Sequence, residues 1–501
     1  MSTTLAPSGV PLTVYPYEDF QGIDASRDKA ALDTGQKQHL ITISNGFADW
    51  RGSIVRDSGA EQRTTGDKVI SHVTFFGRDL ACWAQRDGGG TTLMSDRGHG
   101  ALEIYPRNGV VTSTVFNNRV FFACRNYLMY EYDGFSFTAN QAASQPVPAY
   151  ATSIQRRLAI AGEPGSRTVV NLSRVDDPTV FPADEDVSST AVTKAADIDV
   201  ANIIGTSDEI RGLGVFENNR LVVFTYDKAV LYILNPDYTL WEIDDKSNIQ
   251  VGTISHNTIA QAGSDLLFCA RDGVHSIRRS DTNGVTIYAV PMSNKIDMIY
   301  RELLASVDDE EMISAFFDQD QGQYNIFFPK TDYLSTRLTL TLNPMAGGES
   351  KWSTGDFLNA NCGATLGGVT VFGTPGGIWE RGQIEDMMEV SPEMVVESPI
   401  LWQGALNDTK ESYSFILQAS GKGEVQVEAF DERGRYMSSM QFLIEGGSVD
   451  DKFPDVPLNR QYQRKFEHRY RGVQFRFTAS GAGLLKIIGF AVLIRGGSEE
   501  K

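Results

Sequence analysis

Residues 115–122 read VFNNRVFF, and residues 215–224 read VFENNRLVVF. In both segments a β-branched residue and an aromatic residue lead into a polar turn that contains Asn-Asn-Arg, and an apolar run follows. Asparagine tolerates the left-handed backbone that a tight turn between antiparallel strands requires. Each segment is therefore predicted to form a β-hairpin.

Looser copies of this hairpin occur at residues 73–80, 154–160, 259–268, 316–326 and 364–371. The turns are spaced by roughly 39 to 62 residues, and a repeat of ~40–50 residues with several strands is the size of a propeller blade. We therefore predict an all-β protein in which residues 61–392 form a β-propeller of about six or seven blades. A stack of unrelated β-sandwiches is the alternative, but it would not reuse one hairpin.

The sequence pattern changes after Ser391. Longer segments alternate apolar and polar residues between glycine-rich turns, as in residues 425–430 and 484–494. This alternation is typical of antiparallel sheets with one face in water, so residues 393–501 are predicted to form a C-terminal antiparallel β-sandwich-like domain. Residues 1–60 have weak strand signals and are predicted to be an N-terminal arm that closes the propeller or reaches a neighbour.

One segment has clear helical periodicity. It follows Ser293, a plausible N-cap, and places Ile296, Tyr300 and Leu304 on one face. The four acidic residues 308–311 would oppose the negative end of the helix dipole, so the helix is predicted to end before them.

The charge balance excludes several classes of partner. The 501 residues include 45 Lys and Arg against 64 Asp and Glu, which gives a formal net charge of −19. Tight binding to nucleic acid requires Lys and Arg against phosphate, and an anionic membrane surface also attracts basic segments. No apolar run approaches the ~20 residues that a bilayer requires, so no membrane insertion is expected. The first 15 residues do not resemble a secretory signal, so synthesis in the cytosol is expected.

No catalytic, cofactor-binding or metal-binding motif is recognised, and the protein is predicted not to be an enzyme. The four cysteines are too far apart for a zinc site and are expected to be buried thiols. Asp318-x-Asp320-x-Gly322 resembles the start of a calcium loop, but Pro329 stands where an EF-hand requires glutamate. A hairpin turn is the better interpretation there.

One basic cluster departs from the acidic average. It consists of Arg460, Arg464, Lys465, Arg469 and Arg471. The cluster either contacts an acidic partner subunit or phosphate, or it is only a solvated face. In an acidic oligomer it could dock against a neighbour's acidic segment, either residues 308–311 or Asp184, Glu185 and Asp186.

The sequence also resembles a known family. Residues 22–26 (GIDAS), 31–36 (ALDTGQ) and 171–181 (NLSRVDDPTVF) are similar to segments of bacteriophage tail hub, or nozzle, proteins, and the likeness runs over residues 20–380. Some members are described as packaged-DNA stabilisation proteins of short-tailed phages.

The resemblance implies a structural virion protein built on a β-propeller. Six copies would form a homohexameric ring below the portal and adaptor proteins, surround the DNA exit channel and carry tail fibres or a needle or plug protein. The virion tail would be assembled in the cytoplasm of the host bacterium. An acidic channel wall would let DNA pass during ejection without tight binding.

Two other functions stay open on the sequence. A propeller could act as a glycan hydrolase or lectin on host-surface sugar, with acids and aromatic residues at one mouth of its channel. A cellular propeller scaffold is less compatible, because no WD dipeptide repeat or kelch-like signature is present.

Overall fold

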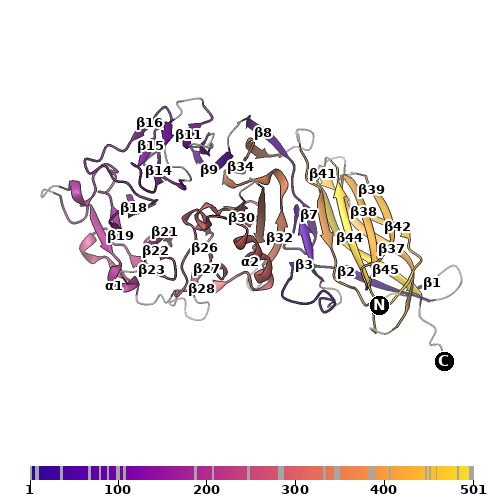
Figure 1. The fold of residues 1–501 in the computed structure, drawn as a ribbon. Coiled ribbons are helices and arrows are strands. Elements are labelled where there is room, and N and C mark those ends of the chain that lie inside the picture. The colour runs from indigo at the N-terminus through magenta and orange to yellow at the C-terminus, as the bar shows by residue number, and fades with distance from the viewer. Residues whose placement is uncertain are drawn as a thin grey trace.

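The fold is seen in a computed structural model, as an elongated body with two joined lobes (Figure 1). The structure describes residues 3–5, 11–33, 38–65, 69–77, 80–86, 90–97, 102–104, 109–185, 189–205, 208–244, 249–279, 287–330, 334–343, 350–382, 390–405, 408–445, 448–450, 453–457, 460–481 and 484–495.

The larger lobe is a β-propeller of seven four-stranded antiparallel blades. The blades are numbered in chain order, and the strands of each are given from the inner to the outer one. Blade one is β9 (Val69–Phe76), β10 (Leu80–Arg86), β11 (Thr91–Ser95) and β12 (Leu102–Ile104); blade two is β13 (Val111–Phe116), β14 (Arg119–Cys124), β15 (Tyr130–Tyr132) and β16 (Phe137–Ala139); blade three is β17 (Tyr150–Ile154), β18 (Arg157–Glu163), β19 (Ser166–Leu172) and β20 (Ala196–Asp199); and blade four is β21 (Ile210–Phe216), β22 (Arg220–Thr225), β23 (Ala229–Ile233) and β24 (Glu242–Ile243). Blade five is β25 (Ala260–Ala262), β26 (Asp265–Ala270), β27 (Gly273–Arg279) and β28 (Ile287–Pro291); blade six is β29 (Ser314–Asp318), β30 (Gln323–Pro329), β31 (Ser335–Thr341) and β32 (Lys351–Gly355); and blade seven is β33 (Cys362–Leu366), β34 (Val369–Thr374), β35 (Gly377–Arg381) and β8 (Ala60–Thr65).

The seven predicted hairpins are the inner strand pairs of these seven blades. Each inner strand contacts the inner strand of the next blade, and β33 contacts β9, so the ring is closed. The predicted propeller is therefore confirmed, and the blade number is seven. Blade seven takes its outer strand from β8, which precedes blade one in the chain.

The two near-identical hairpin sequences form different turns. Asn117 and Asn118 have φ values of 46° and 56° and make a two-residue turn between paired residues Phe116 and Arg119. In the second copy Phe216 pairs with Arg220, so the turn is one residue longer. The residue composition therefore predicts a turn in both places but not its length.

The smaller lobe is an antiparallel sandwich of two sheets. Its C-terminal strands are β36 (Met394–Glu397), β37 (Lys410–Gly421), β38 (Gly423–Asp431), β39 (Tyr436–Ile444), β40 (Ser448–Asp450), β41 (Phe453–Pro457), β42 (Arg460–Lys465), β43 (Arg469–Tyr470), β44 (Val473–Ser480) and β45 (Leu485–Arg495). One sheet runs β36-β44-β38-β39, and the other runs β1-β2-β45-β37-β42. Phe415 from the second sheet lies 5.0 Å from Phe475 of the first, ring centre to ring centre, in the core between them.

Residues 1–60, predicted as a separate arm, contribute strands to both lobes. These strands are β1 (Thr3–Leu5), β2 (Pro11–Glu18), β3 (Phe20–Ile23), β4 (Gln38–Leu40), β5 (Thr42–Ser44), β6 (Gly46–Ala48) and β7 (Ile54–Arg56). Strand β2 pairs with β45 inside the sandwich, and β7 pairs with the start of the same strand. The N-terminal strands therefore lie beside the C-terminal ones (Figure 1).

Strand β5 joins the two lobes. It pairs with β32, the outer strand of blade six, and with β36 of the sandwich, so one nine-stranded sheet runs through both lobes. Asn45, which follows β5 with a φ of 55°, accepts the N–H groups of Asp356 and Phe357 through Oδ1 and donates to the Glu393 carbonyl. One side chain thus binds the end of blade six and the start of the sandwich.

The helices are few and short. They are α1 (Ala201–Ile204), α2 (Asp297–Ala305) and the 3-10 turns η1 (Pro182–Asp184), η2 (Tyr238–Leu240), η3 (His256–Thr258), η4 (Asn294–Ile296), η5 (Glu310–Met312) and η6 (Phe357–Asn359). Helix α2 ends before the 308–311 acids, as predicted, and buries Tyr300. Ser293 is the N-cap residue of η4, which leads into α2, but its side chain makes no capping hydrogen bond there, because its Oγ accepts the Val274 N–H from β27.

Cys124, Cys269 and Cys362 are buried free thiols, and burial raises the pKa of each to about 12. The side chain of Cys82 lies outside the described residues.

The Asp318 segment forms the hairpin turn between β29 and β30, as predicted. Asp318 is fully buried, and its carboxylate pairs with Arg381 of blade seven and accepts the N–H groups of Asp320 and Gln321.

We expect Asn45→Ala to lower the free energy of unfolding by about 1–3 kcal/mol more than Asn359→Ala, since each lost hydrogen bond contributes about 0.5–1.5 kcal/mol. Asn359 has a similar φ of 49°, and the described part of the structure shows no side-chain hydrogen bond from it, so its variant reports backbone strain alone. Urea unfolding would measure both. Equal losses would contradict a joining role for the Asn45 side chain.

We expect Asp318→Ala to lower the free energy of unfolding by about 3–5 kcal/mol, because it leaves the Arg381 guanidinium without its buried partner. Asp320→Ala is the matched control, since Asp320 is an exposed acid in the same turn. Chemical denaturation without added metal would measure the free energy of unfolding of both variants. A loss for Asp320→Ala as large as the loss for Asp318→Ala would argue against a stabilising role of this ion pair.

Candidate functional site

The candidate site lies on one face of the propeller, where the inner strands begin and the second strands end. We call this the axial face. The turns η3 and η5 lie on it, because they directly precede the inner strands β25 and β29. Ser255, which precedes η3, donates its hydroxyl to the Glu311 carbonyl over 3.0 Å and so joins the two turns.

Glu311 is the centre of a charged cluster on the axial face. Its carboxylate pairs with Arg125, 3.0 Å away, and with Arg211 of blade four. Arg125 follows β14 and also donates to Tyr150 Oη over 2.8 Å. Burial raises the pKa of Glu311, and the two guanidinium groups oppose that rise. Blades two, four and six thus meet at one carboxylate, and the Arg125–Tyr150 hydrogen bond adds blade three.

Hydrogen bonds also cross the propeller axis. Asn257 Nδ2, from the turn before blade five, donates to the Val111 carbonyl of blade two over 3.0 Å. His256 Nδ1 accepts the Leu213 N–H, and its ring lies 5.5 Å from that of Tyr150. Residues from blades on opposite sides of the axis are therefore within hydrogen-bonding distance of each other. This leaves no room along the axis for duplex DNA, whose major groove alone is about 12 Å wide.

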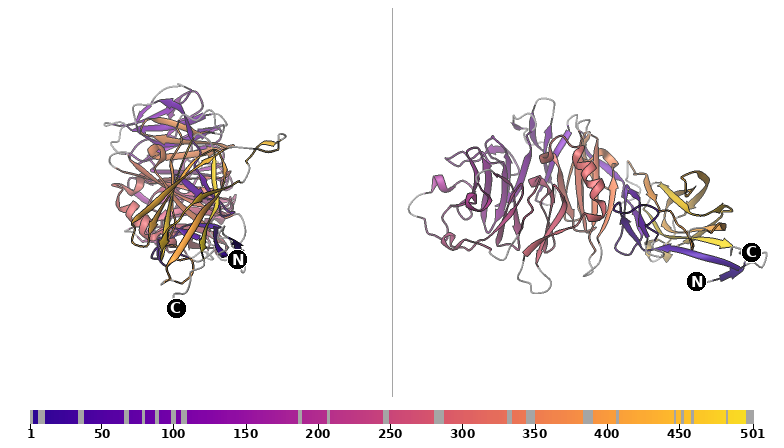
Figure 2. Two further views of the ribbon diagram at one scale, coloured as in Figure 1. Left: turned by 90° about the vertical axis from the view of Figure 1, so that its right-hand side faces the viewer. Right: turned by 60° about the horizontal axis from the view of Figure 1, so that its bottom comes forward.

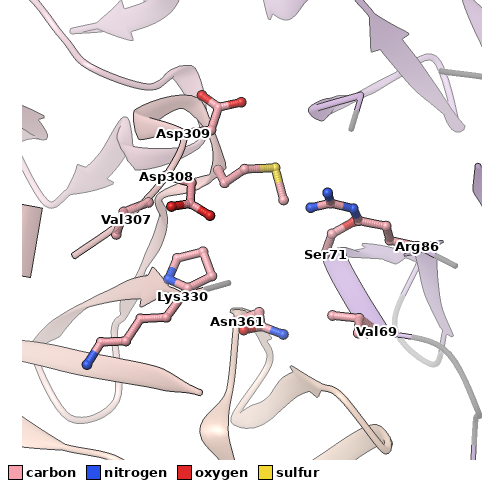
Figure 3. Close-up of a pocket in the computed structure, with 10 residues that line it drawn as sticks. Val69, Ser71, Arg86, Val307, Asp308, Asp309, Lys330 and Asn361 are labelled. Atoms are coloured by element: carbon pink, nitrogen blue, oxygen red, sulfur yellow. The ribbon is translucent and has the colours of Figure 1, made fainter. Parts of the chain in front are cut away.

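A cavity of about 280 Å³ opens between blades six, seven and one on the same face. Arg86, at the end of β10, and Asp308 point toward it from opposite sides (Figure 3). Asn361, just before β33, lies at its edge, and Val307 and Met312 supply apolar surface. The wall therefore combines both signs of charge with an amide and apolar groups, which suits a small polar ligand. Within the described ranges, no group of three His, Cys, Asp or Glu side chains could hold a metal ion.

The predicted basic cluster lies far from the axial face, in the sandwich. Strand β42, which carries Arg460, Arg464 and Lys465, is the edge strand of its sheet, and all three side chains are exposed. Arg469 is on β43, and Arg471 follows it. Lys465 pairs with Glu467 at 2.8 Å, while Arg464 donates to the Gln441 carbonyl. The structure thus brings the cluster together along one sheet edge.

The predicted acidic partner segment lies at the other end of the molecule, in blade three. Glu185 is occupied within its own loop, where it pairs with Arg174 at 2.6 Å and accepts the Ala195 N–H. Asp184 is half-buried and accepts the Ser144 hydroxyl. Asp186 lies outside the described residues. Docking of this segment against the basic cluster of a neighbour stays a prediction, with Glu185 poorly placed for it.

Sequence reasoning missed most of the axial face. It considered Glu311 only as one of four acids after a helix, and it did not single out Arg125, Arg211 or Asn361. These residues share only their position relative to the blade strands. Each lies just before an inner strand, within its first residues, or just after a second strand. That signal becomes readable only once the blade boundaries are known.

No protein-family model matches the chain, and no characterised protein matches it by sequence. Among solved structures, BamB from Moraxella catarrhalis is 10% identical with a TM-score of 0.39, covering 68% of this chain and 92% of its own. YCF48 from Cyanidioschyzon merolae is 9% identical with a TM-score of 0.36, covering 65% and 98%.

The extracellular domain of the putative hybrid two component system BT3049 from B. thetaiotaomicron is 12% identical, with a TM-score of 0.40, and covers 87% of this chain and 61% of its own. Likenesses this distant carry no argument about function. In the part of the chain that the structure describes, no helix has the length and apolar character needed to cross a membrane.

Two histidines near the axis predict acid sensitivity. His72 Nε2 lies 2.8 Å from Ser113 Oγ, His256 Nδ1 accepts the Leu213 N–H, and both histidines are half-buried. Burial lowers the pKa of each to about 4, and His72 further lowers that of His256. The unfolded chain therefore binds protons between pH 6.5 and 4 that the folded chain does not, so stability falls as pH falls through this interval.

We expect each of these histidines to contribute a loss of about 1–2 kcal/mol between pH 7 and pH 5. The double variant His72→Asn/His256→Asn should lose correspondingly less stability over that interval in urea unfolding. An unchanged loss in the double variant would assign the acid sensitivity to other groups.

Proposed function

We propose that this protein is a non-enzymatic structural subunit of a bacteriophage tail hub, or nozzle, which assembles as a homo-oligomeric ring around the DNA exit channel. The observation that carries the proposal is the nine-stranded sheet, which makes the propeller and the sandwich a single rigid piece. The resemblance of residues 20–380 to tail hub proteins supplies the biological setting: a virion tail, assembled in the host bacterial cytoplasm.

Rigidity between the lobes comes from more than the sheet. One continuous hydrophobic core runs from Tyr324 and Trp352 in blade six through Ile43 to Phe415 in the sandwich. An ion pair between Arg337 of blade six and Asp57 of the N-terminal segment lies beside it and is mostly buried. A subunit without a hinge between its lobes suits a ring that must keep its shape while a genome passes.

The filled propeller axis determines where a channel could lie. Since side chains of Arg125, Glu311 and Asn257 bridge the blades, DNA would pass between copies of the chain and not through one propeller. A net charge of −19 on each copy would repel phosphate from the channel wall.

The long axis of the molecule favours a head-to-tail contact between copies. The propeller and the sandwich, whose edge strand β42 carries the basic cluster, lie at opposite ends of the molecule (Figure 1 and the right view of Figure 2). A contact between different surfaces of identical subunits closes into a ring when the rotation permits. In our proposal the basic edge meets an acidic surface of the next copy, and the remaining faces bind the adaptor and the fibres or needle protein.

Native mass spectrometry of the purified chain, alone and with adaptor protein, tests the ring. We expect a species of six times 55.2 kDa that dissociates as salt rises. The double variant Arg464→Glu/Lys465→Glu should weaken assembly at least about tenfold, or ~1.4 kcal/mol. Arg301→Glu is the control, since it reverses an equally exposed charge on α2.

Monomers under every condition would contradict the ring. Cleavage of a host-surface glycan, or its binding without assembly, would replace the proposal with the hydrolase or lectin alternative.

A further inference from the structure

Asn361 is an unusual residue on the wall of the axial cavity. Asn361 is 4% exposed, yet among the described residues neither its Oδ1 nor its Nδ2 has a hydrogen-bond partner. Its backbone is fully engaged, because the N–H donates to the Gly373 carbonyl and the carbonyl accepts the Ser314 hydroxyl. A buried amide with both polar atoms unpaired is costly to the folded protein, so the group is a candidate for a ligand contact.

The cavity beside Asn361 has room for such a ligand. Its 280 Å³ would hold about nine waters at roughly 30 Å³ each, or one to two amino-acid residues. The guanidinium of Arg86 and the carboxylate of Asp308 face it from opposite sides, and the Lys330 side chain runs away from them (Figure 3). Val307 and Met312 add apolar surface to the cavity wall.

From this arrangement we propose that the axial cavity is a binding site for a short zwitterionic peptide segment, with Asn361 as its central hydrogen-bonding residue. An extended residue presents its N–H and C=O on the same side, which matches the acceptor and donor of a carboxamide. Arg86 would face the anionic end of the segment and Asp308 the cationic end, as charge complementarity requires. The site is independent of ring assembly and goes beyond the structural role proposed above.

Saturation-transfer NMR on the full chain, with a panel of zwitterionic dipeptides as the probe, tests this site. We expect the best dipeptides to bind with a dissociation constant of about 1 mM or tighter and to raise the melting temperature. The same dipeptides, acetylated and amidated at their ends, should bind at least about tenfold more weakly, because they lack both charges.

Variants separate the roles of the wall residues. Asn361→Leu should weaken dipeptide binding at least about tenfold without lowering the melting temperature of the free protein, because the replaced amide is costly to the fold and has no partner to lose. Arg86→Met should also weaken binding. Lys330→Met removes the same charge from a side chain that runs away from the cavity centre, so binding should stay within about twofold of the wild type.

Three results would overturn the proposal. The first is a panel in which no dipeptide binds, which would leave the cavity to water. The second is dipeptide binding that Asn361→Leu does not alter. The third is binding of glucose or N-acetylglucosamine, run as parallel probes, in place of peptide. Each of these is independent of the mass of the assembly, so a failed site and a failed ring are distinguishable.

Discussion

The short strand β5 and the Asn45 side chain hold the two lobes of this protein in one hydrogen-bonded sheet. Without that joint, blade six would end at β32 and the sandwich would begin at β36, with two exposed sheet edges between them. Strand β5 pairs with β32 at Ser44–Thr354 and with β36 at three positions, so it covers part of both edges at once. The rigidity of the body, its elongated shape and the placement of its basic edge all follow from this junction.

The axial face combines two kinds of electrostatic environment within one fold. Around Glu311, two guanidinium groups compensate a carboxylate and join blades two, four and six. Beside it, the amide of Asn361 is buried, and no group in the described part of the chain forms a hydrogen bond with it. The ion pairs around Glu311 stabilise the closed propeller. The Asn361 amide, in contrast, would stabilise the protein only when a bound ligand supplies its hydrogen-bond partners.

Local signals in the sequence predict the hairpins of the propeller. They do not predict the long-range strand pairs that complete its last blade and the sandwich. The hairpins were predictable because a turn and its two strands are neighbours in the chain, and the Asn-Asn-Arg and glycine turns mark them directly. The pairing of β8 with β35 and of β2 with β45 joins residues more than 300 positions apart, so no local pattern reports it. Asn361 was missed for a related reason, since its unpaired state depends on groups that only the folded ring brings together.

The pairing of β2 with β45 also has a consequence in time. At roughly 5–20 residues per second, the ribosome would make β45 roughly 25 to 95 seconds after β2. Throughout that delay the apolar face of the early strand lacks its partner, and such strands are prone to pair with other chains. Each newly made copy therefore depends, until its last strand emerges, on protection by chaperones or by sparse spacing on the messenger RNA.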